Sequence, residues 1–509
     1  MDAARAMNGI PKRLLIANRG EIAVRIARTA REMGIEPVGV FAAADAGAFH
    51  TTKMARSIAL GAGPASDTYL SVSRLIRAAE ESGADAVHPG YGFLSENPEF
   101  ARAVAQAGLL WVGPTAESIE KMGDKIEARK RMREAGVPVV PGSDAGAADA
   151  DLFARGVALG FPLLVKAAAG GGGKGMARVD SAEGLAEALE QTSRVAESAF
   201  GDGRVYLEKL FERPRHVEFQ VFGDRFGSVV HLFERECSVQ RRHQKVIEET
   251  PSAALDPRLR EAMGRAAVEA AKAVEYEGAG TIEFLLDERK NFYFLEMNTR
   301  LQVEHPITEE TLGIDLVRTQ IEVASGSPLP PAWRGGKLVP QGHAIELRLY
   351  AEDPREFLPR SGTIRVWEEP GGPGVRVDGG VDEGSRVGLE YDPLLAKLVV
   401  SAPDRDAAIE RARRAVSEWI VLGVETNAEL LLDVLDSGDF RSGRYSTDLI
   451  ARLRRPERDE APPDAAWIAA AAALEQDAAP SVPSGGARSA APGAPADPWD
   501  ALRGWRPGA

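Results

Sequence analysis

Residues 281–306 constrain the fold of this chain more than any other segment, because they alternate polar and apolar side chains on either side of a charged turn. Alternation on both sides of a short turn predicts a β-hairpin. If the loop comprises residues 288–291, Glu283 lies directly opposite Glu296, and Asn298 lies two residues further along the same face. The sequence therefore predicts two carboxylates that face each other.

Opposed carboxylates repel each other unless positive charge lies between them. Carboxylate and amide oxygens suit Mg²⁺, which commonly shares its coordination shell with nucleotide phosphates. The residues that follow the hairpin add a cation, an amide and a third carboxylate in alternate positions: Arg300, Gln302 and Glu304. We therefore expect a site for a metal-bound nucleotide beside a pocket for a small anion. The alternative is a solvated hairpin with scattered charges.

Composition narrows the class of protein. A chain of 509 residues predicts three or four domains, and its net charge of −14 argues against nucleic acid as the main partner. Because the chain has a single cysteine, Cys237, it cannot form an intramolecular disulfide, which fits a reducing cytoplasm. We expect the Cys237 side chain to be packed rather than reactive. No signal peptide or membrane-length apolar run is present, so we expect no membrane association.

The N-terminal region predicts a parallel sheet. An apolar strand at 13–17, an amphipathic helix at 21–33 and a second strand at 37–41 form a β-α-β pattern. The glycine fingerprint of dinucleotide-binding folds is missing after the first strand, which disfavours an NAD enzyme. The turn-rich loop at 88–97 follows another strand, at the edge where open α/β sheets bind ligands. Turn geometry alone explains its glycines equally well.

A run of glycines at 170–173 follows a strand-like segment that ends at Lys166. Glycines let backbone N–H groups approach phosphate oxygens, and a lysine beside them suits polyphosphate. The run is not a P-loop, because the residue after Lys174 is Gly175. A flexible linker is the alternative. Upstream, Asp124 is a predicted N-cap for a helix that begins at Lys125.

The C-terminal part predicts a mainly β lobe. We expect a helix at 313–324, a linker at 326–340, an alternating strand at 344–350 and an amphipathic helix at 405–420. From residue 456 the composition shifts to alanine, proline and glycine, which predicts disorder.

Several strings in the chain closely resemble the biotin carboxylase subunit or domain of biotin-dependent carboxylases of the acetyl-CoA or acyl-CoA carboxylase type. That family belongs to the ATP-grasp superfamily. The resemblance spans roughly residues 12–453 and rests on these strings: Ala17 to Ile22, His88 to Asn97, Met122 to Lys125, Gly173 to Met176, Cys237 to Lys245, Glu296 to Pro306 and Ala351 to Pro354.

The resemblance implies a mixed α/β and α+β architecture. It consists of a Rossmann-like parallel-sheet domain, an ATP-grasp domain with a mobile glycine-loop lid, and a mainly β C-terminal domain. The expected boundaries in this chain are a tail at 1–11, domains at 12–123, 124–332 (with the lid at about 140–212) and 333–455, and a tail at 456–509.

The implied reaction is carboxylation of carrier-bound biotin by bicarbonate, with ATP cleaved through a carboxyphosphate intermediate. By resemblance, Glu283, Glu296 and Asn298 hold two Mg²⁺ or Mn²⁺ ions. The residues implied in nucleotide binding are Lys125, Lys166, Gly172, Gly173, Glu208, Lys209, Phe211, His216, Gln240 and His243, besides the two metal-binding glutamates. Taken by itself, without the resemblance, His216 is better explained as a packed, satisfied histidine.

The remaining implied roles concern bicarbonate and biotin. The bicarbonate pocket comprises Lys245, Arg300, Gln302, Val303 and Glu304. Within it, Glu304 is the implied general base. Arg348 is the implied stabiliser of the biotin enolate, and Tyr91 is expected near biotin.

Two departures from the family pattern affect partners. No Ala/Val-Met-Lys-Met biotinylation sequence is present, so we expect biotin on a separate carrier protein, together with carboxyltransferase subunits that choose the acyl-CoA. Residues 497–506 resemble the start of the connecting domain of larger α-subunits, as a split or truncated subunit would. The family also implies a cytoplasmic homodimer. The competing functions are another ATP-grasp ligase that forms an acyl phosphate, and a silent nucleotide-binding scaffold.

Overall fold

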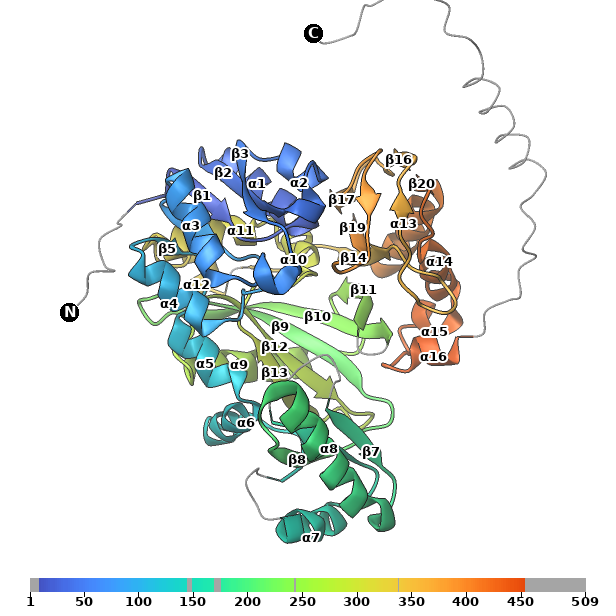
Figure 1. Cartoon of the computed structure of the whole chain (residues 1–509). Helices are drawn as coiled ribbons and strands as arrows, with labels where there is room; N and C mark the ends of the chain where they lie inside the picture. The colour runs from blue at the N-terminus through green and yellow to red at the C-terminus, as the bar shows by residue number, and fades with distance from the viewer. Residues whose placement is uncertain (1–8, 144–148, 169–174, 242–243, 337, 454–509) are drawn as a thin grey trace, which may run out of the picture. The chain divides into compact units, whose positions relative to one another are not determined.

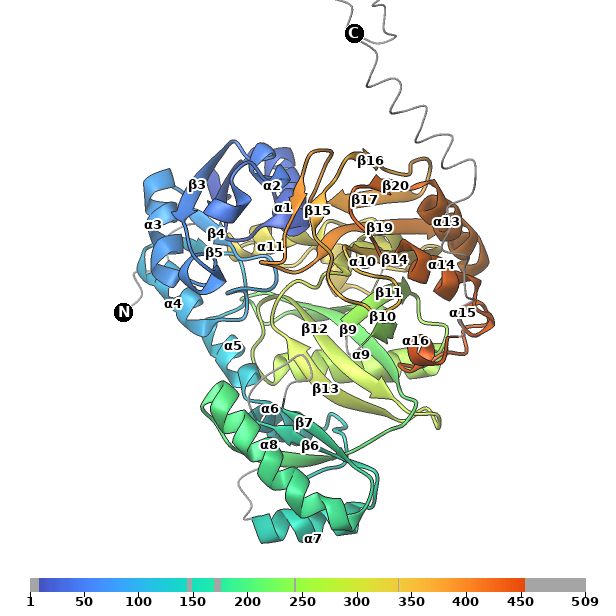
Figure 2. The same cartoon turned by 45° about the vertical axis from the view of Figure 1, so that its right-hand side comes forward.

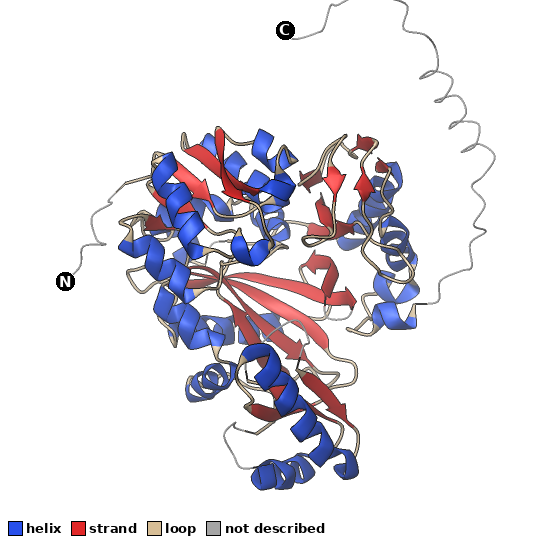
Figure 3. Ribbon diagram, in the orientation of Figure 1, coloured by secondary structure: helices blue, strands red, loops and turns tan. Residues whose placement is uncertain are grey.

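The structure of the protein is a computed structural model, and it describes residues 9–143, 149–168, 175–241, 244–336 and 338–453. The tail predicted at 456–509 lies outside these residues, as do most of the tail at 1–11 and the glycine run at 170–173. The predicted mixture of α/β and α+β architecture is confirmed, with a parallel sheet first and antiparallel sheets after it (Figure 3).

The first sheet is parallel, with the strand order β3-β2-β1-β4-β5. Its strands are β1 (Arg13–Ile16), β2 (Glu36–Ala42), β3 (Arg56–Gly61), β4 (Ala86–His88) and β5 (Leu110–Trp111). Its helices are α1 (Gly20–Glu32), α2 (Phe49–Thr52), α3 (Val72–Ser82), α4 (Pro98–Gln106) and α5 (Ala116–Gly123). The predicted β-α-β opening is confirmed.

The strand order changes direction between β1 and β4, and the loops after these two strands meet there. Asn18 Nδ2 donates hydrogen bonds to the carbonyl oxygens of Pro89 (2.7 Å) and Tyr91 (2.8 Å). Because ligands of open α/β sheets bind at such a point, the 88–97 loop is fixed where the sequence predicted a ligand-facing edge.

A second, antiparallel sheet has the order β7-β6-β8, and α8 packs against it (Figure 2). The elements of this region are α6 (Lys125–Glu134), α7 (Asp149–Leu159), β6 (Leu163–Ala167), β7 (Met176–Val179), α8 (Leu185–Phe200) and β8 (Val205–Lys209). The predicted cap is confirmed, since the Asp124 carboxylate accepts hydrogen bonds from the backbone N–H groups of Ile126 and Glu127.

The central sheet has eight strands in the order β13-β12-β9-β10-β11-β14-β19-β17. Its strands are β9 (Arg215–Gly223), β10 (Val229–Arg241), β11 (Gln244–Thr250), β12 (Gly278–Leu286), β13 (Phe292–Asn298), β14 (His343–Tyr350), β17 (Val375–Gly379) and β19 (Leu394–Ala402). The nearby helices are α9 (Pro257–Lys272), α10 (His305–Leu312), α11 (Leu316–Ala324) and α12 (Pro331–Arg334). Figure 1 shows β9, β12 and β13 side by side. One sheet thus joins the chain before and after residue 333.

The remaining elements cover the end of this sheet. They are β15 (Gly362–Thr363), β16 (Val366–Glu368), β18 (Arg386–Val387), β20 (Ile420–Leu422), α13 (Arg405–Glu418), α14 (Ala428–Asp436), α15 (Gly438–Arg441) and α16 (Leu449–Arg452). The amphipathic helix predicted at 405–420 is confirmed as α13, whose buried face includes Ile409, Ala412 and Val416.

One local prediction was right except at its start, and another was wrong. The helix expected at 313–324 is confirmed as α11, but it begins at Leu316, because Gly313 adopts a left-handed conformation (φ 64°) that ends α10. Asp315 then caps α11 by accepting a hydrogen bond from the Arg318 N–H. The linker expected at 326–340 contains the short helix α12.

A buried carboxylate on β11 ties the central sheet to the C-terminal helices. Glu249 is 1% exposed, and its carboxylate contacts His343 Nε2 (2.6 Å), Arg405 Nε (2.7 Å) and the Tyr445 hydroxyl. Burial alone would raise the pKa of Glu249, but the hydrogen bonds from His343 and Arg405 lower it to about 2. Ionised Glu249 therefore stabilises the folded state.

We expect Glu249→Gln to lower the free energy of unfolding by about 3 kcal/mol at pH 7. Because the folded-state pKa is depressed, the wild-type advantage is complete above the unfolded-state value and is lost as the pH falls toward about 2. Urea denaturation of both proteins between pH 7 and pH 3 measures this difference. A gap that stays constant over that range would contradict the assignment.

Candidate active site

The hairpin brings the two predicted carboxylates together by a different turn from the one predicted. Leu286 pairs with Phe292, so the turn has one more residue than expected, and a β-bulge before Glu296 compensates for it. Glu283 is therefore opposite Glu296, as predicted. Asn298 pairs with Thr281 on the same face.

A third carboxylate continues this row onto the next strand. Glu218 on β9 is opposite Glu283 on β12, and it is completely buried. Lys245 Nζ lies 2.5 Å from Glu218 Oε2, 2.9 Å from Glu283 Oε1 and 2.6 Å from Glu304 Oε1. Burial would lower the pKa of Lys245, but the acidic groups around it raise it well above its ordinary value. One ammonium group thus serves three carboxylates.

Glu283 is the most densely contacted of these carboxylates. Its Oε1 accepts hydrogen bonds from Asn298 Nδ2 (2.9 Å) and Gln302 Nε2 (3.2 Å), and its Oε2 lies 2.8 Å from His216 Nε2. Burial would raise the pKa of Glu283, but Lys245 and His216 lower it well below its usual range. Glu283 is therefore ionised at neutral pH.

Glu296 completes a set of hard oxygen donors. Its Oε2 faces Lys125 Nζ across 3.9 Å, and Asn298 Oδ1 accepts from Arg300 Nη2 (3.1 Å). Partial burial of the carboxylate, and secondly repulsion from Glu283, raise the pKa of Glu296. Two opposed carboxylates and an amide oxygen on one face fit Mg²⁺ or Mn²⁺, because a divalent cation would remove this repulsion.

An ion pair with a residue of the parallel-sheet region fixes the orientation of the Arg300 side chain. Its Nε lies 2.9 Å from Glu96 Oε2, while Glu96 Oε1 accepts from the Thr299 N–H (3.0 Å). The Arg300 Nη1 also donates to Gln302 Oε1 (2.9 Å). The predicted anion pocket thus has a fixed guanidinium, and a residue of the 88–97 loop fixes it.

Glu304, the predicted base, is completely buried at the start of α10. Its two oxygens divide their contacts, since Oε1 faces Lys245 and Oε2 accepts from Arg348 Nη2 (2.9 Å). Burial would raise the pKa of Glu304, but Lys245, Arg348 and Arg235 lower it well below its usual range. The neighbouring Val303 carbonyl accepts from Lys397 Nζ (2.8 Å).

Four of the residues predicted around the nucleotide lie on the small sheet and its connection to β9: Lys166, Glu208, Lys209 and Phe211. Lys166 Nζ donates to Glu208 Oε2 (2.9 Å), and both side chains are buried. Phe211 stacks on Tyr293 with ring centroids 5.0 Å apart. The Lys209 ammonium donates to the carbonyl oxygens of residues 160 (3.0 Å) and 161 (2.9 Å), so it is already committed within this region.

The other predicted residues fall in three places. Gln240 is opposite Lys245 in the β10–β11 pair. Tyr91 lies with its ring centroid 5.9 Å from Lys397 Nζ, next to the Val303 contact. Gly172, Gly173 and His243 lie outside the described residues.

Sequence reasoning missed three polar residues that support this site. Glu218 and Glu96 were not singled out, although each lies in a segment that was. Arg235 was also missed; it is completely buried and donates to Glu218 Oε1 (2.6 Å), Gln220 Oε1 (2.9 Å) and Thr308 Oγ1 (2.9 Å). For Glu218, the local sequence shows only ordinary strand alternation and offers no signal of this role.

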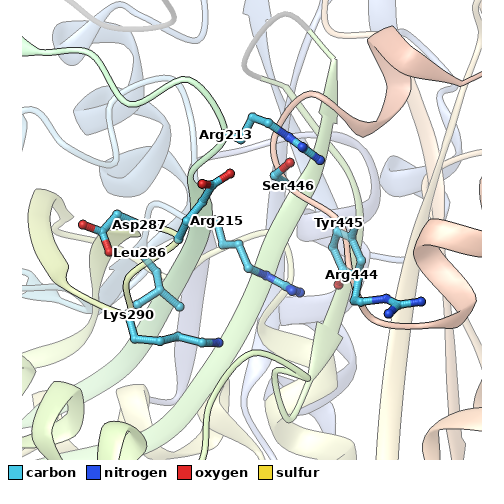
Figure 4. A pocket seen from close by; sticks show the side chains of 9 residues that line it. Arg213, Arg215, Leu286, Asp287, Lys290, Arg444, Tyr445 and Ser446 are labelled. Atoms are coloured by element: carbon cyan, nitrogen blue, oxygen red, sulfur yellow. The ribbon is translucent and has the colours of Figure 1, made fainter.

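A separate cavity of about 180 Å³ opens beside the hairpin turn. Figure 4 shows Arg215 from β9 and Lys290 from the turn extending toward it, with Tyr445 on the other side. None of its lining residues is a predicted site residue. The arrangement of charge, and not this hollow, therefore locates the candidate site.

Comparison with known families accounts for nearly all of the described chain. Residues 10–119 match the N-terminal domain of biotin carboxylase, residues 124–332 the ATP-binding domain of the carbamoyl-phosphate synthase L chain, and residues 346–452 the C-terminal domain of biotin carboxylase. The biotin carboxylase of Halalkalibacterium halodurans is 48% identical over 442 residues, which cover 86% of this chain and 97% of that protein. The chain belongs to the biotin carboxylase family.

Other members of the biotin carboxylase family are similar over the same region. The mitochondrial methylcrotonoyl-CoA carboxylase α-subunit of Rattus norvegicus is 45% identical over 441 residues, covering 86% of this chain and 61% of that subunit. Biotin carboxylases are ATP-dependent ligases, so the predicted enzyme class is confirmed.

Solved structures of biotin carboxylases share this fold. The biotin carboxylase–β,γ-ATP complex from Campylobacter jejuni superposes with a TM-score of 0.84 at 44% identity, covering 87% of this chain and 99% of that one. The biotin carboxylase domain dimer of Hydrogenobacter thermophilus 2-oxoglutarate carboxylase, solved with MgADP, ADP and bicarbonate, has a TM-score of 0.84 at 42% identity, with coverages of 88% and 100%. Among helices of the described residues, none combines the length and apolar character that crossing a bilayer requires.

Proposed function

We propose that this chain carboxylates biotin on a separate carrier protein, using bicarbonate and ATP, as the first half-reaction of an acyl-CoA carboxylase. The observation that carries the proposal is the meeting of Lys245, Glu304 and Arg348 beside the Glu283–Glu296 pair. Paired carboxylates suit a metal-bound nucleotide, and the cations beside them suit a small anionic substrate.

Two divalent ions, Mg²⁺ or Mn²⁺, would be held by Glu283, Glu296 and Asn298, and when bound they would neutralise charge on the phosphates of ATP. Lys125, Lys166 and His216 would supply further positive charge to those phosphates. Glu208, Lys209 and Phe211 would line the adenine side, with Gln240 and His243 as additional nucleotide contacts. The glycine loop with Gly172 and Gly173 would close over the phosphates.

Bicarbonate would be held by Lys245, Arg300, Gln302 and the backbone of Val303. Glu304 would take its proton, so that a bicarbonate oxygen attacks the γ-phosphorus and ADP leaves. A base with so low a pKa is weak while Lys245 and Arg348 contact it. Bicarbonate that engages Lys245 would weaken the hold of this ammonium group on Glu304 and raise the basicity of Glu304.

Carboxyphosphate formed in this way would break down to CO₂ and phosphate, and the phosphate would take the ureido proton of biotin. Arg348 would stabilise the negative charge that develops on the biotin oxygen. Tyr91 would lie near biotin, because its ring is next to Lys397, which donates a hydrogen bond to the Val303 carbonyl oxygen.

We propose a carrier protein and a carboxyltransferase as partners, because similar chains are named as subunits of pyruvate carboxylase and methylcrotonoyl-CoA carboxylase. The carboxyltransferase would choose the acyl-CoA. A homodimer is proposed by analogy with the dimer of the Hydrogenobacter domain. A single cysteine, buried at Cys237, agrees with a cytoplasmic location.

The function is tested by ADP release with free biotin in the presence and absence of bicarbonate. We expect turnover to require ATP, Mg²⁺ and bicarbonate, and to rise when biotin is added. ATP turnover that does not depend on bicarbonate would instead indicate a different ATP-grasp ligase. Nucleotide binding without turnover would indicate a silent scaffold.

A further inference from the structure

A pair of buried glutamates lies next to Arg348 in the central sheet, and the proposed reaction gives neither of them a role. Glu248 on β11 and Glu346 on β14 are directly opposite each other in the antiparallel pairing. Both side chains are completely buried. Arg348 is two residues further along β14, on the same face as Glu346.

Glu248 contacts the side of the guanidinium that also reaches the predicted base. Arg348 Nη2 forms an ion pair with Glu248 Oε1 and lies 2.9 Å from Glu304 Oε2. Arg348 Nε is buried and makes no hydrogen bond within the part of the chain that the structure describes. The guanidinium is therefore shared between two carboxylates and keeps one donor unused.

Glu346 differs from Glu248 in that it forms no ion pair with Arg348. Among the described residues, the carboxylate oxygens of both glutamates lack a hydrogen bond of ordinary geometry, and burial raises the pKa of Glu346 well above the ordinary value. Burial also raises the pKa of Glu248, to about 7, although Arg348 opposes this change. Two facing buried carboxyl groups do not both remain ionised, so the charge resides on the one that contacts Arg348.

The other strand beside Arg348 adds a second buried cation. Lys397 on β19 is opposite Arg348, and its Nζ is 3.2 Å from Glu21 Oε2 and 2.8 Å from the Val303 carbonyl oxygen. Lys397 thus flanks Arg348 on the side away from Glu248. Without Glu248, Lys397 would repel the guanidinium and Glu304 would attract it. Arg348 would then move toward Glu304.

We propose that Glu248 is a positioning residue, which holds Arg348 between itself and Glu304 so that the guanidinium is available to biotin. The inference rests on the proposed biotin carboxylase function. It assigns Glu248 to the biotin-dependent part of the reaction, because Arg348 acts there, and not to the cleavage of ATP that follows attack by bicarbonate.

The test measures two rates in Glu248→Gln: bicarbonate-dependent ADP release without biotin, which reports carboxyphosphate formation and hydrolysis, and ADP release with saturating biotin. Losing a charged hydrogen-bond partner is expected to lower the biotin-dependent rate about tenfold or more, while the biotin-independent rate changes by less than about threefold. The ratio of the two rates is the decisive quantity, because a merely structural defect lowers both together.

Glu249→Gln is the matched control. Glu249 is adjacent on β11, equally buried and also ion-paired, but its partners are His343 and Arg405. We expect its two rates to keep the wild-type ratio. If Glu248→Gln does not fold, Glu248→Asp retains the charge but withdraws it from Arg348, and the same selective loss is expected.

A double-mutant cycle separates positioning from other effects. In an Arg348→Gln background, Glu248→Gln should cause no further loss of biotin-dependent turnover, because its effect passes through Arg348. The inference is overturned if Glu248→Gln retains the biotin-dependent rate, if both rates fall equally, or if the two substitutions act additively. A wild-type enzyme without bicarbonate-dependent ADP release would instead overturn the proposed function.

Discussion

Glu304→Gln should retain binding of Mg-ATP and lose turnover by about 10²- to 10⁴-fold, the range expected when a general base is removed. The carboxamide keeps the shape of the side chain and one acceptor for Lys245 or Arg348, but it cannot accept the bicarbonate proton. Calorimetric titration with Mg-ATP and an assay of bicarbonate-dependent ADP release measure the two properties separately.

Glu249→Gln serves as the control for this experiment also, because it removes a buried, paired carboxylate that lies away from the row on β9, β12 and β13. It should lose stability and retain turnover at a temperature where it is folded. Unchanged turnover in Glu304→Gln would exclude Glu304 as the base. Loss of Mg-ATP binding would mean that the substitution disrupts the site as a whole.

Lys245→Met is the second substitution with a large expected effect. It would leave Glu218, Glu283 and Glu304 without the ammonium that contacts all three. Removing one member of a buried ionic network typically lowers the free energy of unfolding by about 3–5 kcal/mol. Adding Mg²⁺ should restore part of the loss, because a divalent cation binds the folded state at these carboxylates.

Lys397→Met provides the comparison. Lys397 is completely buried, more so than Lys245, and pairs with Glu21, so its removal should also destabilise the protein. Mg²⁺ should raise its melting temperature no more than that of the wild type. Equal Mg²⁺ effects in the two methionine variants would contradict a cation site at Glu283 and Glu296.

The pairing of Glu283 with Glu296 could be predicted because strand alternation and the number of residues between them are properties of the sequence. The turn could not be predicted, since the same number of residues can be divided between a longer turn and a bulge. The prediction was therefore right about the pair and wrong about the loop that joins it.

Burial was harder to predict than pairing. Residues 344–350 alternate apolar and polar side chains, a pattern typical of a strand with one solvated face. In the structure every residue of β14 is buried, including Glu346 and Arg348. Burial of the polar face depends on Lys397 and Glu248, which come from strands distant in sequence.

Glu218 illustrates the limit most clearly. Its strand, β9, alternates in sequence like any half-buried strand, and nothing local separates Glu218 from a solvated glutamate. Its importance arises from register with Glu283 and from contact with Lys245 and Arg235. These are tertiary facts, and only an assembled sheet supplies them.

The contact between Glu96 and Arg300 has a consequence for how this chain could be divided. A fragment that begins at residue 124 would contain every carboxylate proposed to hold metal, together with Lys245 and Glu304. Its Arg300 would lack the acidic partner that the preceding 123 residues contribute. Such a fragment would need the missing piece restored, in cis or by complementation, before it regained affinity for hydrogen carbonate.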